Sequence, residues 1–135
     1  MLPLRFAPWW RTASGVLLVL VLTLAVMPVV WLWPDRIKFI DWFGEIDKWA
    51  HALVFAVLAI WFAGQYRPRS YWRIALGLLL YGVLIELCQR MLSYRSAEWL
   101  DVAADVAGIM TGLLIAAAGL GGWSQRFEAK IAAQS

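Results

Sequence analysis

Three side chains that ionise in water lie inside long apolar stretches of this 135-residue sequence: His51, Glu86 and Asp105. Each has a polar neighbour three or four residues away, on the same face of a helix. These neighbours are Asp47 beside His51, Gln89 beside Glu86 and Asp101 beside Asp105. Carboxylate and imidazole groups so arranged can exchange protons or bind the polar groups of a ligand.

The apolar surroundings favour a functional reading of these groups. A charged side chain at the centre of a membrane span costs at least ~2.5 kcal/mol, so such groups face the interior of a helix bundle and pair there. Structural alternatives stay open for each residue. Asp47 and Asp101 could be interfacial charges or helix N-caps, His51 a hydrogen-bonded core residue, and Glu86 half of an ion pair with Arg90 or Arg95.

The residue counts exclude several kinds of chemistry. One His and one Cys, Cys88, cannot build a two-His zinc site within one subunit or an internal disulfide. A mixed site of His51 with carboxylates stays open. The sequence has no Gly-rich phosphate loop and no serine-protease motif. We assign no metal ligand, catalytic residue or cofactor from the sequence, and a net charge of +3 spread over the span edges does not indicate nucleic-acid binding.

Membrane-spanning helices must position these side chains. Hydrophobic residues make up 63% of the chain and charged residues 16%, against roughly half and a quarter in soluble domains. About 20 mostly apolar residues cross the hydrocarbon core as a helix. Four stretches qualify, at about 13–33, 48–66, 74–92 and 102–123. We predict an all-α membrane protein with four transmembrane helices in a single domain, 1–135.

The positions of the basic residues predict the orientation of the spans. The short turn that contains Arg67, Arg69 and Arg73 has no acidic residue, so we place it and both termini in the cytoplasm. In the first outer loop, apolar residues recur every three positions at Ile37, Ile40, Phe43 and Ile46. This pattern predicts a short amphipathic interfacial segment, with an irregular loop as the alternative.

In this topology, His51, Glu86 and Asp105 reach similar depth on the extracytoplasmic side, at about 1.5 Å of rise per residue. The fourth span also carries Gly108 and Gly112, whose spacing lets helix backbones approach closely. We predict a packing role for these glycines, either between helices of one chain or in a homo-oligomer.

The motifs, taken in order, resemble the VanZ-like family of small bacterial membrane proteins. The resemblance covers about residues 47–118. It rests on Asp47-Lys48-x-x-His51-x-x-x-Phe55-x-x-Leu58, Glu86-x-x-Gln89, Tyr94-Arg95 and Asp101-x-x-x-Asp105-x-x-Gly108-x-x-x-Gly112. One departure is Asp105, where the family usually has Asn. The resemblance implies a multi-pass protein of the bacterial inner (plasma) membrane. The family takes its name from an accessory factor in resistance to teicoplanin, a lipid-bearing glycopeptide.

Together these observations predict an outward-facing polar pocket that binds a cell-envelope lipid or an amphiphilic antibiotic. Its predicted ligand-binding residues are His51, Glu86, Gln89, Arg95, Asp101 and Asp105, with Asp47, Lys48, Gly108 and Gly112 in structural roles. One alternative is an intramembrane enzyme on a lipid-linked substrate, with Glu86 or Asp105 as base and His51 as acid. Another is a structural subunit of an envelope complex. Transport ranks last, because the cytoplasmic half of the spans contains no ionisable residue.

Overall fold

The computed structural model describes residues 1–27, 36–92 and 98–134, and for residues 36–45 it describes the backbone alone. These residues form helices and short connections, with no strand among them. The elements are α1 (Ala7–Val26), α2 (Arg36–Gln65), the 3-10 turn η2 (Pro68–Ser70), α3 (Tyr71–Arg90), α4 (Trp99–Ile115), the π-helical turn η3 (Ala116–Leu120) and α5 (Trp123–Gln134). Four of the segments are long and apolar enough to cross a membrane, at Ala7–Val26, Ile46–Gln65, Pro68–Arg90 and Trp99–Leu120. The predicted fold class is confirmed.

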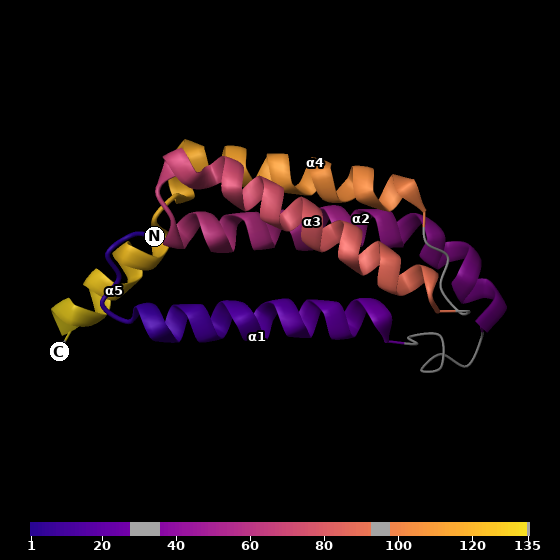
Figure 1. Ribbon diagram of the computed structural model, residues 1–135, viewed down its shortest axis with the longest axis horizontal. Helices are drawn as coiled ribbons and strands as arrows, with labels where there is room; N and C mark the ends of the chain where they lie inside the picture. Colours follow the sequence, from indigo (N-terminus) through magenta and orange to yellow (C-terminus); the bar gives the residue numbers. More distant parts are fainter. Residues whose placement is uncertain (28–35, 93–97, 135) are drawn as a thin grey trace.

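The four long helices run side by side, with both chain termini at one end (Figure 1). α4 packs mainly against α2, and glycine makes this contact close. A Cβ atom added at Gly108 would clash with the carbonyl oxygen of Ala52 and lie 3.0 Å from its Cα, while one at Gly112 would lie 2.7 Å from the Cβ of Ala59. The two glycines are therefore buried against α2 of the same chain. A second copy could not use them without displacing α2.

Some helix boundaries differ from the expected ones. The first span begins at Ala7, about one and a half turns before the predicted start, and the predicted residues 28–33 lie outside the described residues. The segment 37–46 is helical, but it continues directly into the second span as part of α2. Its N-terminal part runs obliquely to the rest of α2 (Figure 1). The placement of this segment in the membrane interface stays a prediction.

The fourth span ends in a break, and a further helix that was not predicted follows it. Gly119 and Gly122 have φ angles of 157° and 68°, which L side chains rarely adopt. Two glycines in this conformation turn the chain away from α4, and α5 then runs along the end of the bundle that carries the termini (Figure 1). Hydropathy does not predict α5, because this helix is too polar to span a membrane.

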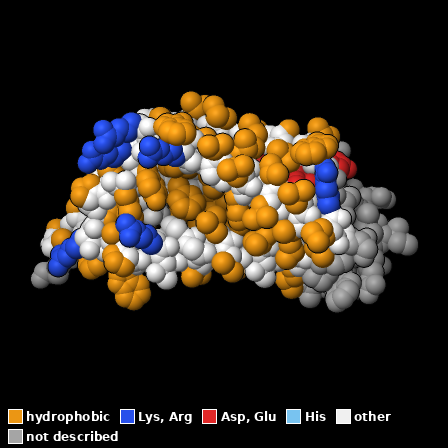
Figure 2. Space-filling model, in the orientation of Figure 1, with side chains coloured by type: hydrophobic (Ala, Val, Ile, Leu, Met, Phe, Trp, Pro, Cys, Tyr) orange, Lys and Arg blue, Asp and Glu red, His pale blue; other side chains and the backbone are white. Residues whose placement is uncertain are grey.

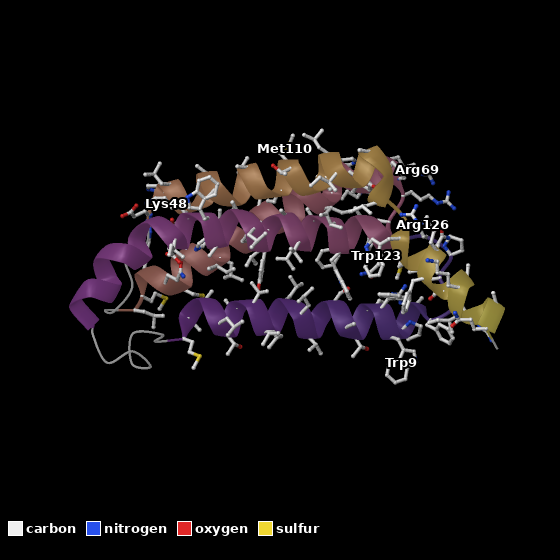
Figure 3. The ribbon with its side chains drawn as sticks, turned by 180° about the vertical axis from the view of Figure 1, so that it is seen from behind. Trp9, Lys48, Arg69, Met110, Trp123 and Arg126 are labelled. Atoms are coloured by element: carbon white, nitrogen blue, oxygen red, sulfur yellow. The ribbon has the colours of Figure 1, made fainter. Side chains whose placement is uncertain are left out.

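Side-chain types are distributed unevenly along the bundle. Hydrophobic side chains cover the middle of the visible face, most of its Lys and Arg lie toward the terminal end, and its acidic side chains lie at the other end (Figure 2). Arg69 and Arg126 thus lie at the opposite end from Lys48 (Figure 3). A buried core that includes Phe55, Leu58 and Ile85 joins α2, α3 and α4.

Hydrogen bonds and aromatic contacts close the terminal end. The carboxylate of Glu128 in α5 accepts bonds from the backbone N–H groups of Arg5 (2.7 Å) and Phe6 (3.0 Å) and from the indole N–H of Trp10 (2.8 Å). The ring of Trp10 also contacts the ring of Trp123, with centroids 5.4 Å apart. The structure thus brings Trp10 and Trp123, which lie far apart in the sequence, into contact.

Candidate functional site

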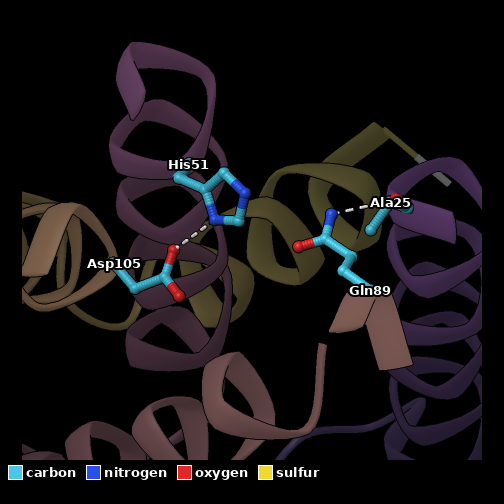
Figure 4. A network of polar contacts seen from close by, with 4 residues as sticks. All are labelled: Ala25, His51, Gln89 and Asp105. Carbon is cyan, nitrogen blue, oxygen red and sulfur yellow. Dashed lines mark hydrogen bonds and ion pairs between the residues drawn. The ribbon is translucent and has the colours of Figure 1, made fainter. Parts of the chain in front are cut away.

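A buried pair of side chains from α2 and α4 lies toward the end of the bundle opposite the chain termini, which we call the acidic end. His51 Nδ1 and Asp105 Oδ1 are 2.8 Å apart (Figure 4). Asp105 is fully buried and His51 is 8% exposed. Because an ionised carboxylate only accepts hydrogen bonds, the pair places the proton of a neutral imidazole on Nδ1 and leaves Nε2 as an acceptor.

Two glycines determine how closely this pair can form. Gly108 contacts the backbone of Ala52, the residue after His51, and Asp105 lies one turn earlier on the same face of α4. On the other side, a Cβ at Gly82 of α3 would lie 2.5 Å from Asp105 Oδ2. The absence of side chains at both positions lets the carboxylate fit between three helices. Gly82 and Glu86 are four residues apart and lie on the same face of α3.

Two more carboxylates lie beside the histidine. Asp47 precedes His51 by one turn of α2, and Asp101 precedes Asp105 by one turn of α4. One potential metal-ligating atom from each of Asp47, His51 and Asp101 lies within 4.8 Å of the others. Asp101 is 3% exposed. Helical repeats on two adjacent helices therefore bring these groups together.

Glu86 is buried without a described donor. It is 2% exposed, and no described residue forms a hydrogen bond with either of its carboxylate oxygens. The predicted alternative of an ion pair with Arg90 is not formed, because the Arg90 guanidinium stacks on the Trp99 ring, 4.5 Å from its centroid. The electrostatic neighbours of Glu86 include Asp101, His51 and Asp105, and also Arg90, which forms no hydrogen bond with it.

The remaining predicted residues have different positions. Gln89 donates a hydrogen bond to the carbonyl oxygen of Ala25 in the last turn of α1, at 3.0 Å (Figure 4). Lys48 forms an ion pair with Glu98 at 3.1 Å, and both side chains are partly exposed. Arg95 lies outside the described residues. Gln89 therefore holds α1 at this end of the bundle, and Lys48 links α2 to the start of α4.

A comparison with family models supplies the classification. The VanZ/LLP1 model matches residues 4–120. The chain belongs to the VanZ/LLP1 family. The resemblance predicted from residues 47–118 is thus confirmed, and the match extends over the first span. No curated protein and no solved structure gave a significant match.

We define the acidic cluster as Asp47, His51, Glu86, Asp101 and Asp105. All five residues lie within the VanZ/LLP1 match. All of α5 lies beyond the matched residues. The cluster contains four carboxylates and one imidazole, and no Lys or Arg in the described part of the chain forms a hydrogen bond with Glu86 or Asp105. Its chemistry is therefore that of an acceptor site, suited to protons, hydrogen-bond donors or a cation.

A cavity in this VanZ/LLP1 protein lies elsewhere. It has a volume of about 360 Å³ and is lined by Met1, Leu18, Phe62, Tyr66, Ser70, Arg73, Ile74, Gly77, Leu78 and Tyr81. These residues lie nearer the terminal end of α1, α2 and α3 than the acidic cluster does. The cluster itself is packed, with its members other than Asp47 at most 8% exposed. Among the predicted ligand-binding residues, His51, Asp101 and Asp105 thus lie close together, whereas the predicted open pocket stays a prediction.

Proposed function

We propose that this VanZ/LLP1-family protein recognises the polar headgroup of a cell-envelope lipid at its acidic end. The observation that carries the proposal is the buried Glu86 carboxylate, which has no described hydrogen-bond partner. A buried acceptor without a donor destabilises a protein by about 1–3 kcal/mol, and more when it is charged. A ligand that supplies the donor would recover this free energy on binding.

The excess of acceptors favours a ligand rich in hydroxyl or ammonium groups. Glu86 Oε1, Glu86 Oε2 and Asp105 Oδ2 are all unpaired acceptors among the described residues. Sugar hydroxyls and protonated amines donate to carboxylates, and charge-assisted bonds of this kind are about twice as strong as neutral ones. Envelope lipids and lipid-bearing glycopeptide antibiotics share this chemistry. The partly exposed Lys48 carries a positive charge that favours an adjacent phosphate.

The membrane orientation is part of the proposal. We place the terminal end in the cytoplasm of a bacterial cell and the acidic cluster at the outer surface of the inner membrane. The purely basic turn at Arg67, Arg69 and Arg73 lies at the terminal end, and such loops stay on the cytoplasmic side. The cluster then lies at the depth of outer-leaflet headgroups.

Native mass spectrometry of protein released from membranes tests the proposal. We expect wild-type protein to retain a lipid that Glu86→Gln loses. Glu98→Gln is the matched control, because it removes a carboxylate from the same end but outside the cluster. A parallel titration with teicoplanin separates the two ligand sources. Equal lipid retention by wild type and both variants would contradict the proposal and favour a structural subunit.

The His51–Asp105 pair supports a second candidate, an enzyme that acts on a lipid-linked substrate. A carboxylate 2.8 Å from an imidazole is the arrangement that orients a histidine for proton transfer. In this candidate the protonated form of His51 acts as the acid and Glu86 as the base. Incubation with polyprenyl-phosphate and phospholipid substrates should then yield a product with wild type but not with His51→Gln. Binding without turnover would contradict the enzyme candidate and support recognition only.

A further inference from the structure

The acidic cluster contains a donor set for a metal ion that the sequence analysis did not assign. We propose that Asp47, His51 and Asp101 bind a divalent transition-metal ion, with Zn²⁺ as the best match, and that Asp105 orients His51 for this role. The first observation is the 4.8 Å limit on the mutual distances of their ligand atoms. Tetrahedral zinc requires ligand atoms about 3.4 Å apart. Small side-chain rotations would close the remaining gap.

The hydrogen bond to Asp105 prepares the histidine for a metal. Metal-binding histidines usually donate their second ring N–H to a carboxylate or carbonyl, which fixes the tautomer and the ring orientation. Asp105 Oδ1 holds His51 Nδ1 at 2.8 Å in this way. The other ring nitrogen points away from Asp105 (Figure 4). Nε2 is therefore the metal-binding atom, and Asp105 is a positioning residue.

A second observation points to a cation. Glu86 is buried at 2% exposure with both carboxylate oxygens unpartnered among the described residues. Asp101 and His51, two members of the donor set, are among its electrostatic neighbours. A divalent ion would balance the negative charge that four carboxylates create around one imidazole. Three protein ligands also leave one position open, as in catalytic zinc sites.

The chemistry of the donor set selects the metal. Ca²⁺ and Mg²⁺ prefer six or more oxygen ligands, whereas imidazole nitrogen favours zinc and its first-row neighbours. One nitrogen with two carboxylates therefore fits Zn²⁺ better than the alkaline-earth ions. This inference goes beyond headgroup recognition and does not depend on it, since the metal site needs only side chains of this chain.

The chain's single histidine makes the test specific. Full-length protein with a non-histidine affinity tag would be labelled with ¹⁵N-histidine, held in detergent and titrated with Zn²⁺. We expect one Zn²⁺ per chain, a large shift of the Nε2 signal and a persistently protonated Nδ1. Unchanged His51 signals in wild-type protein would overturn the proposal without any variant.

Variants then assign the ligands. By equilibrium dialysis, Zn²⁺ affinity should be lost in His51→Gln and fall at least about tenfold in Asp47→Asn and Asp101→Asn. For Asp105→Asn we expect a fall of about 10–100-fold, the usual effect of removing such a carboxylate, together with a changed ¹⁵N signature of Nδ1. Glu98→Gln should bind as wild type does. Equal affinity in Asp101→Asn and wild type, with both proteins helical and monodisperse, would refute the site. No lipid is added in these measurements. A failure to bind Zn²⁺ would therefore refute the metal site without contradicting headgroup recognition.

Discussion

Gly82 of α3 faces Asp105 of α4 so closely that a Cβ atom at position 82 would lie 2.5 Å from the Oδ2 oxygen. The same Cβ would lie 3.3 Å from the Phe55 ring of α2. One missing methyl group therefore gives the Asp105 carboxylate its place among three helices. Since Asp105 also holds His51, the space at Gly82 maintains the geometry of the acidic cluster.

Gly82→Ala should destabilise the bundle by about 1–3 kcal/mol, the usual effect of overpacking, and weaken the His51–Asp105 hydrogen bond. Denaturant unfolding in detergent micelles would measure the first effect, and the ¹⁵N signals of His51 the second. Gly77→Ala is the matched control on the same helix, because a Cβ there meets no atom within 4 Å. A Gly82→Ala protein as stable as Gly77→Ala would contradict this account of the packing.

Gln89→Leu should loosen the C-terminal end of α1. The amide of Gln89 donates to the Ala25 carbonyl, one of the last in the helix, which has no later N–H partner within α1. Loss of this bond should cost about 0.5–1.5 kcal/mol. Hydrogen–deuterium exchange should become faster in the last turn of α1 and stay unchanged at its start. Tyr81→Phe, which removes the bond to the Leu18 carbonyl at 2.5 Å, should instead affect the middle of α1.

The docking of α5 onto the N-terminal segment should weaken in acid. Burial alone would raise the pKa of Glu128, but the N–H groups of Phe6, Arg5 and Trp10 outweigh it and hold the pKa below the ordinary 4.5. Because the folded state binds the proton more weakly than the unfolded state, this stabilisation is complete above about pH 4.5 and is lost as pH falls through the lower folded pKa.

Thermal unfolding of wild type and Glu128→Gln between pH 7 and pH 3 would test this linkage. The difference in melting temperature between the two proteins should be largest at neutral pH and vanish toward pH 3. Comparing the two proteins cancels the titration of the other carboxylates. A difference that does not change with pH would show that Glu128 contributes no pH-dependent stability.

The proposed topology predicts opposite reactivity at the two ends. In a Cys88→Ala background, which removes the single native cysteine, Glu98→Cys should react with a membrane-impermeant thiol reagent on intact spheroplasts. Arg69→Cys should react only after permeabilisation, because its exposed turn lies at the opposite end of the bundle. Labelling of both positions from outside, or the reverse pattern, would contradict cytoplasmic termini.

The sequence by itself determined the fold class and the four spans, and it singled out His51, Glu86, Asp101 and Asp105, four of the five members of the acidic cluster. Apolar runs of about 20 residues identify the spans, because a helix of this length crosses the hydrocarbon core with its backbone hydrogen bonds satisfied internally. Helical spacing places Asp47 on the same face as His51, and Asp101 on the same face as Asp105. Because a charged side chain is unfavourable in contact with lipid, these faces are expected to point into the helix bundle.

Only the tertiary structure decided which groups meet. The pairing of His51 with Asp105, the isolation of Glu86 and the bond from Gln89 to α1 depend on how each helix is rotated about its axis. Hydropathy does not predict this rotation. Because lipid tails are as apolar as leucine, the lipid-facing and protein-facing sides of a span can be equally hydrophobic. Helix rotation depends instead on close contacts at particular residues, such as Gly108 against Ala52 and Gly82 against Asp105. The docking of α5 likewise depends on a glycine break and on Glu128, neither of which leaves a periodic signal in the sequence.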